Sequence, residues 1–337
     1  MEEVGAGGGW VGRKGSAIPT QTPASPGARE AGRFAATPAQ IPWHGWRAVL
    51  IRTGLEAASD RVSLVAAGCA FWGTLALFPA LSMLISIYGL VFDPVTVLPQ
   101  LNLLREFLPP AAFSLVADRI EVLIGHPAAS LQWSVAISAG VTLWSATTGT
   151  KALISALNVA YEETERRSFF VYQLVSLGIT LAAVVAAVVG LAMMVLLPAL
   201  LDFIGLAAHR RLLLTLGGHG VLVVFLLLGL SVLYRIGPCR RAASWAWVLP
   251  GAFLATFLWV GSSALFSWYV ANLAGYDALY GPLGAVAGVL MWFWITIYAV
   301  LLGAEMNSEL ELQTAADTTG AGRPPGERGA FVADHVA

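Results

Sequence analysis

The chain has 337 residues, of which 57% are hydrophobic and only 12% are charged, and its mean hydropathy is +0.73. Because a soluble globular domain contains roughly 25% charged residues, this composition excludes an ordinary soluble domain and indicates an integral membrane protein. The net charge is -1, and no basic patch is interleaved with aromatic residues, so nothing indicates a nucleic-acid partner.

Residues 1–42 are rich in Gly, Ala, Pro and Thr with scattered charge, which predicts a disordered N-terminal tail. The tail contains no short cleavable apolar segment, so we expect membrane insertion to depend on the first span. A G-x-G-x-x-G match begins at Gly7, but no strand precedes it and no patterned helix follows. The match therefore does not indicate a nucleotide site.

After the tail, Trp43, Trp46 and Leu50 recur at roughly helical spacing, while Arg47 and Arg52 face elsewhere. This pattern predicts an interfacial helix on the cytoplasmic surface, anchored by its tryptophans. The alternative is an ordinary linker that contains two tryptophans.

Six apolar runs follow, and each is long enough to cross about 30 Å of hydrocarbon as a helix. They occupy approximately residues 62–91, 132–150, 170–201, 212–234, 246–271 and 282–304. The sequence therefore predicts an all-α, polytopic integral membrane protein with six transmembrane helices. Its membrane domain is expected at residues 43–312 and a disordered C-terminal tail at 313–337.

Basic residues are distributed unequally between the two ends of these spans. Nine Lys or Arg residues flank the side on which both termini lie, and four flank the opposite side. The positive-inside rule then predicts cytoplasmic N- and C-termini. On the outer face, the connection between the first two spans keeps a 3.6-residue period that is broken at Pro109 and Pro110, which predicts two amphipathic helices capping the bundle.

In each of the first two spans, polar residues lie on one face of the helix. The stripe on the second span comprises Ser134, Ser138, Thr142, Ser145 and Gly149, and the stripe on the first comprises Thr74, Ser82 and Ser86 on a face that also passes Pro79. Pro79 lies near the middle of its span and predicts a kink, because it removes one backbone hydrogen bond. The hydroxyl groups either line a polar cavity, as in transporters, or form helix packing contacts worth about 1 kcal/mol each.

The last span begins sharply at Pro282, which suits the first position of a helix. Four polar residues follow the apolar run and are predicted to mark the return to water: Glu305, Asn307, Glu309 and Glu311. Glu305 has two interpretations. It is either a solvated acid at the end of the helix or the partner of Lys151 or Arg61 in a charge lock that acts as a gate.

The sequence contains no catalytic or metal-binding constellation. The five histidines are scattered without a pair at i, i+4, and no G-x-S-x-G elbow, Walker loop or kinase motif set is present. Cys69 lies inside an apolar run and Cys239 in a basic loop, so no disulfide is predicted. We therefore expect no enzyme activity, no metal and no cofactor.

Three blocks of sequence are distinctive: residues 70–81 in the first span, 143–161 at and beyond the end of the second, and 280–307 in the last. These three blocks resemble the YihY/virulence factor BrkB family of bacterial inner-membrane proteins, and the resemblance covers roughly residues 45–312. The matching motif residues are Asn158, Tyr280, Gly281, Gly284, Glu305 and Asn307. Departures are modest: Trp72 stands where the family is expected to have Tyr, and Ala76 where Ser is expected.

The family has been labelled both as virulence or serum-resistance factors and as a tRNA-processing ribonuclease. We expect a multi-pass protein of the bacterial plasma (inner) membrane that acts as a translocator or envelope factor for a lipid-like or amphipathic substrate. Its cavity would lie between the first, second and sixth spans. The alternative is a scaffold that does not transport, and a ribonuclease is a distant third. The expected partners are membrane lipids and envelope proteins, with the oligomeric state left open.

Overall fold

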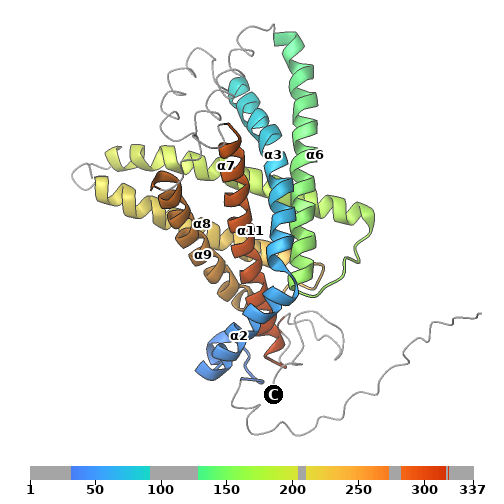
Figure 1. The fold of residues 1–337 in the computed structure, drawn as a ribbon. Helices are drawn as coiled ribbons and strands as arrows, with labels where there is room; N and C mark the ends of the chain where they lie inside the picture. The colour runs from blue at the N-terminus through green and yellow to red at the C-terminus, as the bar shows by residue number, and fades with distance from the viewer. Residues whose placement is uncertain (1–31, 92–127, 204–209, 273–281, 316–317, 319–337) are drawn as a thin grey trace, which may run out of the picture.

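The regular structure is helical throughout the residues that the computed structural model describes (Figure 1). These residues are 32–91, 128–203, 210–272, 282–315 and 318. Their elements in chain order are a short 3-10 helix η1 (Pro38–Gln40), α2 (Trp43–Ser59), α3 (Val62–Val91), α6 (Ala128–Ala160), α7 (Phe169–Phe203), α8 (Arg210–Ile236), α9 (Trp245–Asn272) and α11 (Pro282–Leu312).

Each of the six predicted apolar runs lies within one of the long helices, which confirms the all-α prediction. Two helices extend well beyond the predicted runs: α6 continues to Ala160 and α11 to Leu312. Within the residues that the structure describes, three helices are long and apolar enough to cross a membrane, through Phe169–Ala186, Trp245–Tyr269 and Val286–Leu312. Val62–Ala76 and Leu222–Ile236 are shorter apolar segments within the described part of the chain.

The long helices form two groups that differ in direction. In Figure 1, α3, α6 and α11 run steeply, and α3 packs against both of the others. The helices α7 and α8 contact each other and lie across this group, while α9 packs between α8 and α11. The loop after α6 leads into α7, so the two helices cross near the start of α7.

The interfacial segment before the first span is a helix, so the linker alternative is wrong. Its buried face is not the tryptophan stripe but a row of small and β-branched residues, Gly45, Val49, Thr53 and Ala57. This face packs against α11 and α3, where small side chains allow a close approach. Trp43 and Leu50 are exposed on the other side.

The helices α9 and α11 approach each other closely at two glycines. A Cβ atom added to Gly251 would overlap the carbonyl oxygen of Gly303, and one added to Gly303 would overlap that of Gly251. The Tyr234 hydroxyl at the end of α8 donates to the carbonyl of Val300, with 2.7 Å between the oxygens. Glycine at both positions is therefore a condition for the packing of these helices.

The two ends of the described chain pack together. Gln313 and Thr314 are buried, and the Thr314 hydroxyl donates to the carbonyl of Ala35 at 2.7 Å. The backbone N–H of Ala315 donates to the carbonyl of Arg33 at 2.8 Å. Packed structure therefore begins within the predicted N-terminal tail and extends into the first residues of the predicted C-terminal tail. The predicted outer-face helices at 92–127, Tyr280 and Gly281 lie outside the described residues.

Candidate functional site

The polar residues at the end of α11 are buried, so the prediction that they mark the return to water is wrong. The exposed fraction is 2% for Glu305, 0% for Asn307, 1% for Glu309 and 2% for Glu311. We call these four residues the α11 polar cluster. They are covered because α2 packs on this end of α11, and because most of the cluster has partners that replace water.

Two arginines far away in sequence neutralise two of the acids. The Arg52 Nε atom lies 2.6 Å from Oε2 of Glu309, and its Nη2 donates to Oε1 of Gln313 at 2.5 Å. Arg240 forms a buried ion pair with Glu311, and its guanidinium lies over the Tyr161 ring, 4.0 Å from the centroid. Burial alone would lower the pKa of Arg240, but the carboxylate of Glu311, together with Tyr161 and Glu163, outweighs the effect of burial and the pKa is raised.

The amide of Asn307 joins three parts of the fold. Its Oδ1 accepts a hydrogen bond from the backbone N–H of Gly251 at 2.7 Å, and its Nδ2 donates to the carbonyl of Val248 at 3.1 Å. A longer bond of 3.3 Å runs from Nδ2 to the Tyr161 hydroxyl. Asn307 therefore fixes α11 to the first turns of α9 and to the end of α6.

The other motif asparagine, Asn158, joins two loops. Its Nδ2 donates to Oε2 of Glu165 at 3.1 Å, and its Oδ1 accepts from the backbone N–H of Cys239 at 2.7 Å. Arg167 donates to the carbonyls of residues 236, 237 and 238, which end α8. Both cysteines are free, as the sequence predicts.

Glu305 differs from Glu309 and Glu311 because it forms no ion pair with a described residue, and its Oε1, like that of Glu311, is buried without a hydrogen-bond partner among the described residues. The carboxylates of Asp60, Glu309 and Glu56 act on it electrostatically and disfavour a negative charge there. Burial and the charge of Glu56 raise the pKa of Asp60.

The structure does not bring Glu305 together with Lys151 or Arg61 in an ion pair between described residues. Arg61 is exposed at the junction of α2 and α3, where its φ of 51° is in the left-handed region. Lys151 instead faces α7.

The hydroxyl stripes are described only at their ends. The buried Thr74 hydroxyl donates to the carbonyl of Ala70 in its own helix at 2.8 Å, and Ser145 is half-buried. A Cβ atom at Gly149 would lie 3.7 Å from the Trp72 carbonyl oxygen, so this end of the stripe packs against α3. The side chains of Pro79, Ser82, Ser86, Ser134, Ser138 and Thr142, and the surroundings of Gly284, lie outside the described set.

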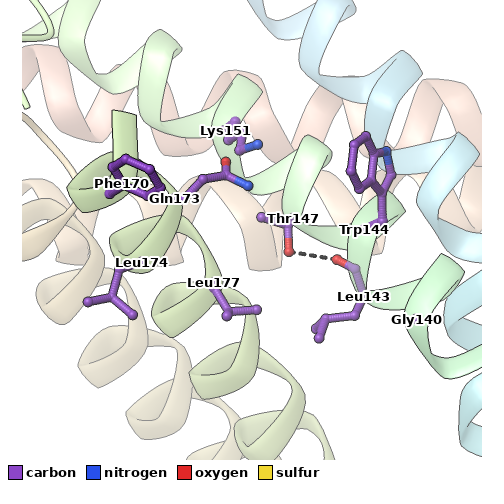
Figure 2. A pocket seen from close by; sticks show the side chains of 9 residues that line it. All are labelled: Gly140, Leu143, Trp144, Thr147, Lys151, Phe170, Gln173, Leu174 and Leu177. Atoms are coloured by element: carbon purple, nitrogen blue, oxygen red, sulfur yellow. Dashed lines mark hydrogen bonds between the residues drawn. The ribbon is translucent and has the colours of Figure 1, made fainter. Parts of the chain in front are cut away.

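A groove of about 370 Å3 opens between α6 and α7, on the side of α6 that faces away from α11 (Figure 2). Its walls are Gly140, Leu143, Trp144, Thr147, Lys151, Phe170, Gln173, Leu174 and Leu177. Figure 2 shows Lys151 and Gln173 near each other at one end, with aromatic residues, leucines and the hydroxyl of Thr147 around the rest. We call this surface the α6–α7 groove.

Hydrogen bonds hold the two walls of the groove together. The Tyr172 hydroxyl donates to the carbonyl of Lys151 at 3.1 Å, and the hydroxyls of Thr150 and Thr180 lie 2.8 Å apart. Sequence reasoning placed Lys151 in a charge lock and missed the groove. The available signal was Gln173, a lone amide one turn inside an apolar run.

The fold and these sites define an all-helical, multi-pass membrane protein with a buried polar cluster at one end of its last helix. The family described as Virulence factor BrkB matches residues 55–327, and the chain belongs to this family. This finding confirms the resemblance predicted from the three sequence blocks.

Curated relatives of the chain have names of two different kinds. The chain is 32% identical over 251 residues to the "Putative ribonuclease-like protein YfkH" of Bacillus subtilis (strain 168), which covers 72% of this chain and 87% of that protein. It is 29% identical to a UPF0761 membrane protein of Alkalilimnicola ehrlichii, over 86% of this chain and 65% of the relative, a little under two thirds of its length. No solved structure matches the chain.

Proposed function

We propose that this protein binds an amphipathic, lipid-like molecule and moves it within or across the bacterial plasma membrane. The observation that supports the proposal is the α6–α7 groove, which combines a cation and an amide at one end with leucine and aromatic walls. The sequence placed the substrate path between the first, second and sixth spans. The groove suggests instead a path on the opposite side of the second span.

The polar end gives such a groove its selectivity. Acyl chains gain little by leaving neighbouring lipid for a leucine wall, because lipid tails and leucine are similarly apolar. A headgroup, by contrast, can only cross hydrocarbon if polar partners replace its water. Lys151 and Gln173 supply such partners beside an apolar wall.

We propose the six-span topology with both termini in the cytoplasm for the same protein. The nine basic residues on one side against four on the other support it. The helix α7, at 35 residues, is about 52 Å long, so it can cross about 30 Å of hydrocarbon even when tilted by roughly 55°. This length is compatible with the direction of α7 across the steep helices in Figure 1.

Transport can be measured with the full-length protein in proteoliposomes that contain a fluorescent phospholipid, using a membrane-impermeant quencher. We expect the quenched fraction to exceed that of protein-free vesicles, with or without a proton gradient. The Leu174→Trp variant, which fills the groove, should remove the excess. Val185→Trp is the matched control, because Val185 is an exposed α7 residue that does not line the groove.

No protein-dependent quenching under either condition would contradict transport and favour the scaffold. The name of YfkH also motivates one added assay, in which the same preparation is incubated with precursor tRNA and divalent metal. Cleavage that is lost on chelation would replace the translocator by the ribonuclease.

A further inference from the structure

We infer that the α6–α7 groove selects phospholipids whose headgroup contains a phosphate diester and a free hydroxyl. The phosphate lies against the amine of Lys151, and the hydroxyl donates to the side-chain carbonyl of Gln173. This inference rests on the proposed function and names the substrate class at its site.

Lys151 is a half-buried cation whose charge is not neutralised by an ion pair with any described residue. By contrast, the arginines at the α11 polar cluster are paired with Glu309 and Glu311. An ammonium group has three donors and no acceptor, so an anion in the groove satisfies it. In a membrane, the anion available at this position is the phosphate of a lipid.

Gln173 provides the second polar contact. Its Oε1 is buried and has no hydrogen-bond donor among the described residues. A buried acceptor without a donor is unfavourable, and a ligand that supplies a hydroxyl removes that cost. Since both residues line one groove, a single headgroup can reach them together.

The depth of the two residues fits a lipid held at the membrane interface. The apolar segment of α7 begins at Phe169, so Gln173 lies about 6 Å and Leu177 about 12 Å along the helix from its start. The polar end is thus near the headgroup level and the leucines lie in the acyl region. Phe170, 81% exposed, is an aromatic residue of the kind found at the headgroup level.

The arrangement predicts an order of preference among lipids with identical acyl chains. Phosphatidylglycerol offers the phosphate and the hydroxyl. Phosphatidylmethanol offers the same charged diester without the hydroxyl, and phosphatidylcholine adds a quaternary cation beside Lys151 and has no donor for Gln173. We expect retention to fall in that order.

The test is native mass spectrometry of the full-length protein released from mixed micelles with equal amounts of the three lipids. The wild type should retain at least about tenfold more phosphatidylglycerol than phosphatidylcholine, a factor that corresponds to about 1.4 kcal/mol. Lys151→Gln should lose that preference and Lys151→Arg should keep most of it. Gln173→Leu should abolish the preference for phosphatidylglycerol over phosphatidylmethanol without reducing phosphatidylmethanol itself. Arg47→Gln, at an exposed cation of α2, is the control for non-specific attraction.

Equal retention of all three lipids by the wild type, or an unchanged preference in Lys151→Gln, would overturn the inference. The two proposals fail separately. Transport that is equal for all headgroups and blocked by Leu174→Trp would keep the function and reject the headgroup site. Lipid selection through Lys151 without any transport would keep the site and reject the translocator.

Discussion

The α11 polar cluster and the α6–α7 groove both place charged and amide groups among apolar helices, but they differ in how those groups are satisfied. In the cluster, Glu309, Glu311 and Asn307 have partners from other elements of the fold. In the groove, Lys151 and Gln173 lack such partners among the described residues. Paired polar groups hold helices together, whereas unpaired ones are available to a ligand. The comparison predicts that mutations in the cluster affect folding and mutations in the groove affect binding.

The largest effect is expected at the contact between α9 and α11. Gly251→Leu should prevent assembly, because even a Cβ atom there overlaps the backbone of Gly303. Fluorescence-detected size-exclusion chromatography in detergent should show aggregated or absent protein. Gly54→Ala is the control: nothing lies within 4 Å of its added Cβ, and alanine favours a helix by about 1 kcal/mol over glycine. A monodisperse Gly251→Leu protein would contradict the packing described above.

Breaking the buried ion pair should have the next largest effect. Arg240→Ala leaves Glu311 as a buried unpaired charge, and should lower the free energy of unfolding by about 3–5 kcal/mol. Replacing both residues by methionine should recover much of the loss. Arg47→Ala, at an exposed site, should stay within about 0.5 kcal/mol of the wild type. Chemical unfolding in mixed micelles measures all three, and an Arg240→Ala protein as stable as the control would show that the pair is dispensable.

Asn307→Ala should cost about 1–3 kcal/mol, because it leaves the backbone N–H of Gly251 without its acceptor. Tyr161→Phe removes only the longer 3.3 Å bond to the same side chain and should cost less. The same unfolding assay ranks the two variants, and the reverse order would mean that Asn307 does not link α11 to α9.

Glu305 is the exception within the α11 polar cluster. Its variant tests whether Glu305 stabilises the fold, as the rest of the cluster does, or is dispensable for folding, as the groove residues are. Glu305→Gln keeps the shape of an unpaired, buried side chain and removes its charge, so stability should stay equal or rise by about 1 kcal/mol. The charge lock makes the opposite prediction: Glu305→Gln and Lys151→Met would each destabilise, and exchange of the two charges would partly restore stability. Thermal unfolding of the wild type, the two single variants and the charge-exchanged double variant distinguishes the two predictions.

The smallest effect concerns the loop between α6 and α7. Partial burial acts to raise the pKa of Glu165, but hydrogen bonds from the Arg167 backbone, Cys239 and Asn158 outweigh it and lower the pKa. A lowered carboxyl pKa contributes stability that is present above the ordinary glutamate pKa and lost as pH falls through the lowered value. The melting temperature should therefore fall slightly more between pH 7 and acid conditions in the wild type than in Glu165→Gln. Parallel curves would show that this loop contact is neutral.

The existence and order of the helices follow from local information. Each apolar run is long enough to cross the hydrocarbon. There it forms a helix, because a helix satisfies all the backbone hydrogen bonds within the segment itself. The motif asparagines were also found, because Asn158 and Asn307 stand out in blocks of family resemblance. Their partners could not be predicted, since Asn158 bonds to Cys239 and Asn307 to Gly251 through contacts between distant segments.

The sequence by itself determined that this is an all-helical membrane protein, because composition and apolar run length depend on no long-range contact. Its three motif blocks likewise indicated the BrkB family, which the family match shows. Only the tertiary structure decided the role of each polar residue. Glu309 and Glu311 end an apolar helix like solvated acids, yet Arg52 and Arg240 arrive from other elements and allow them to be buried. Lys151 resembles an end-of-helix cation, yet the crossing of α7 places it in a groove. Burial and pairing are properties of surroundings that distant segments supply, so a local pattern cannot contain them.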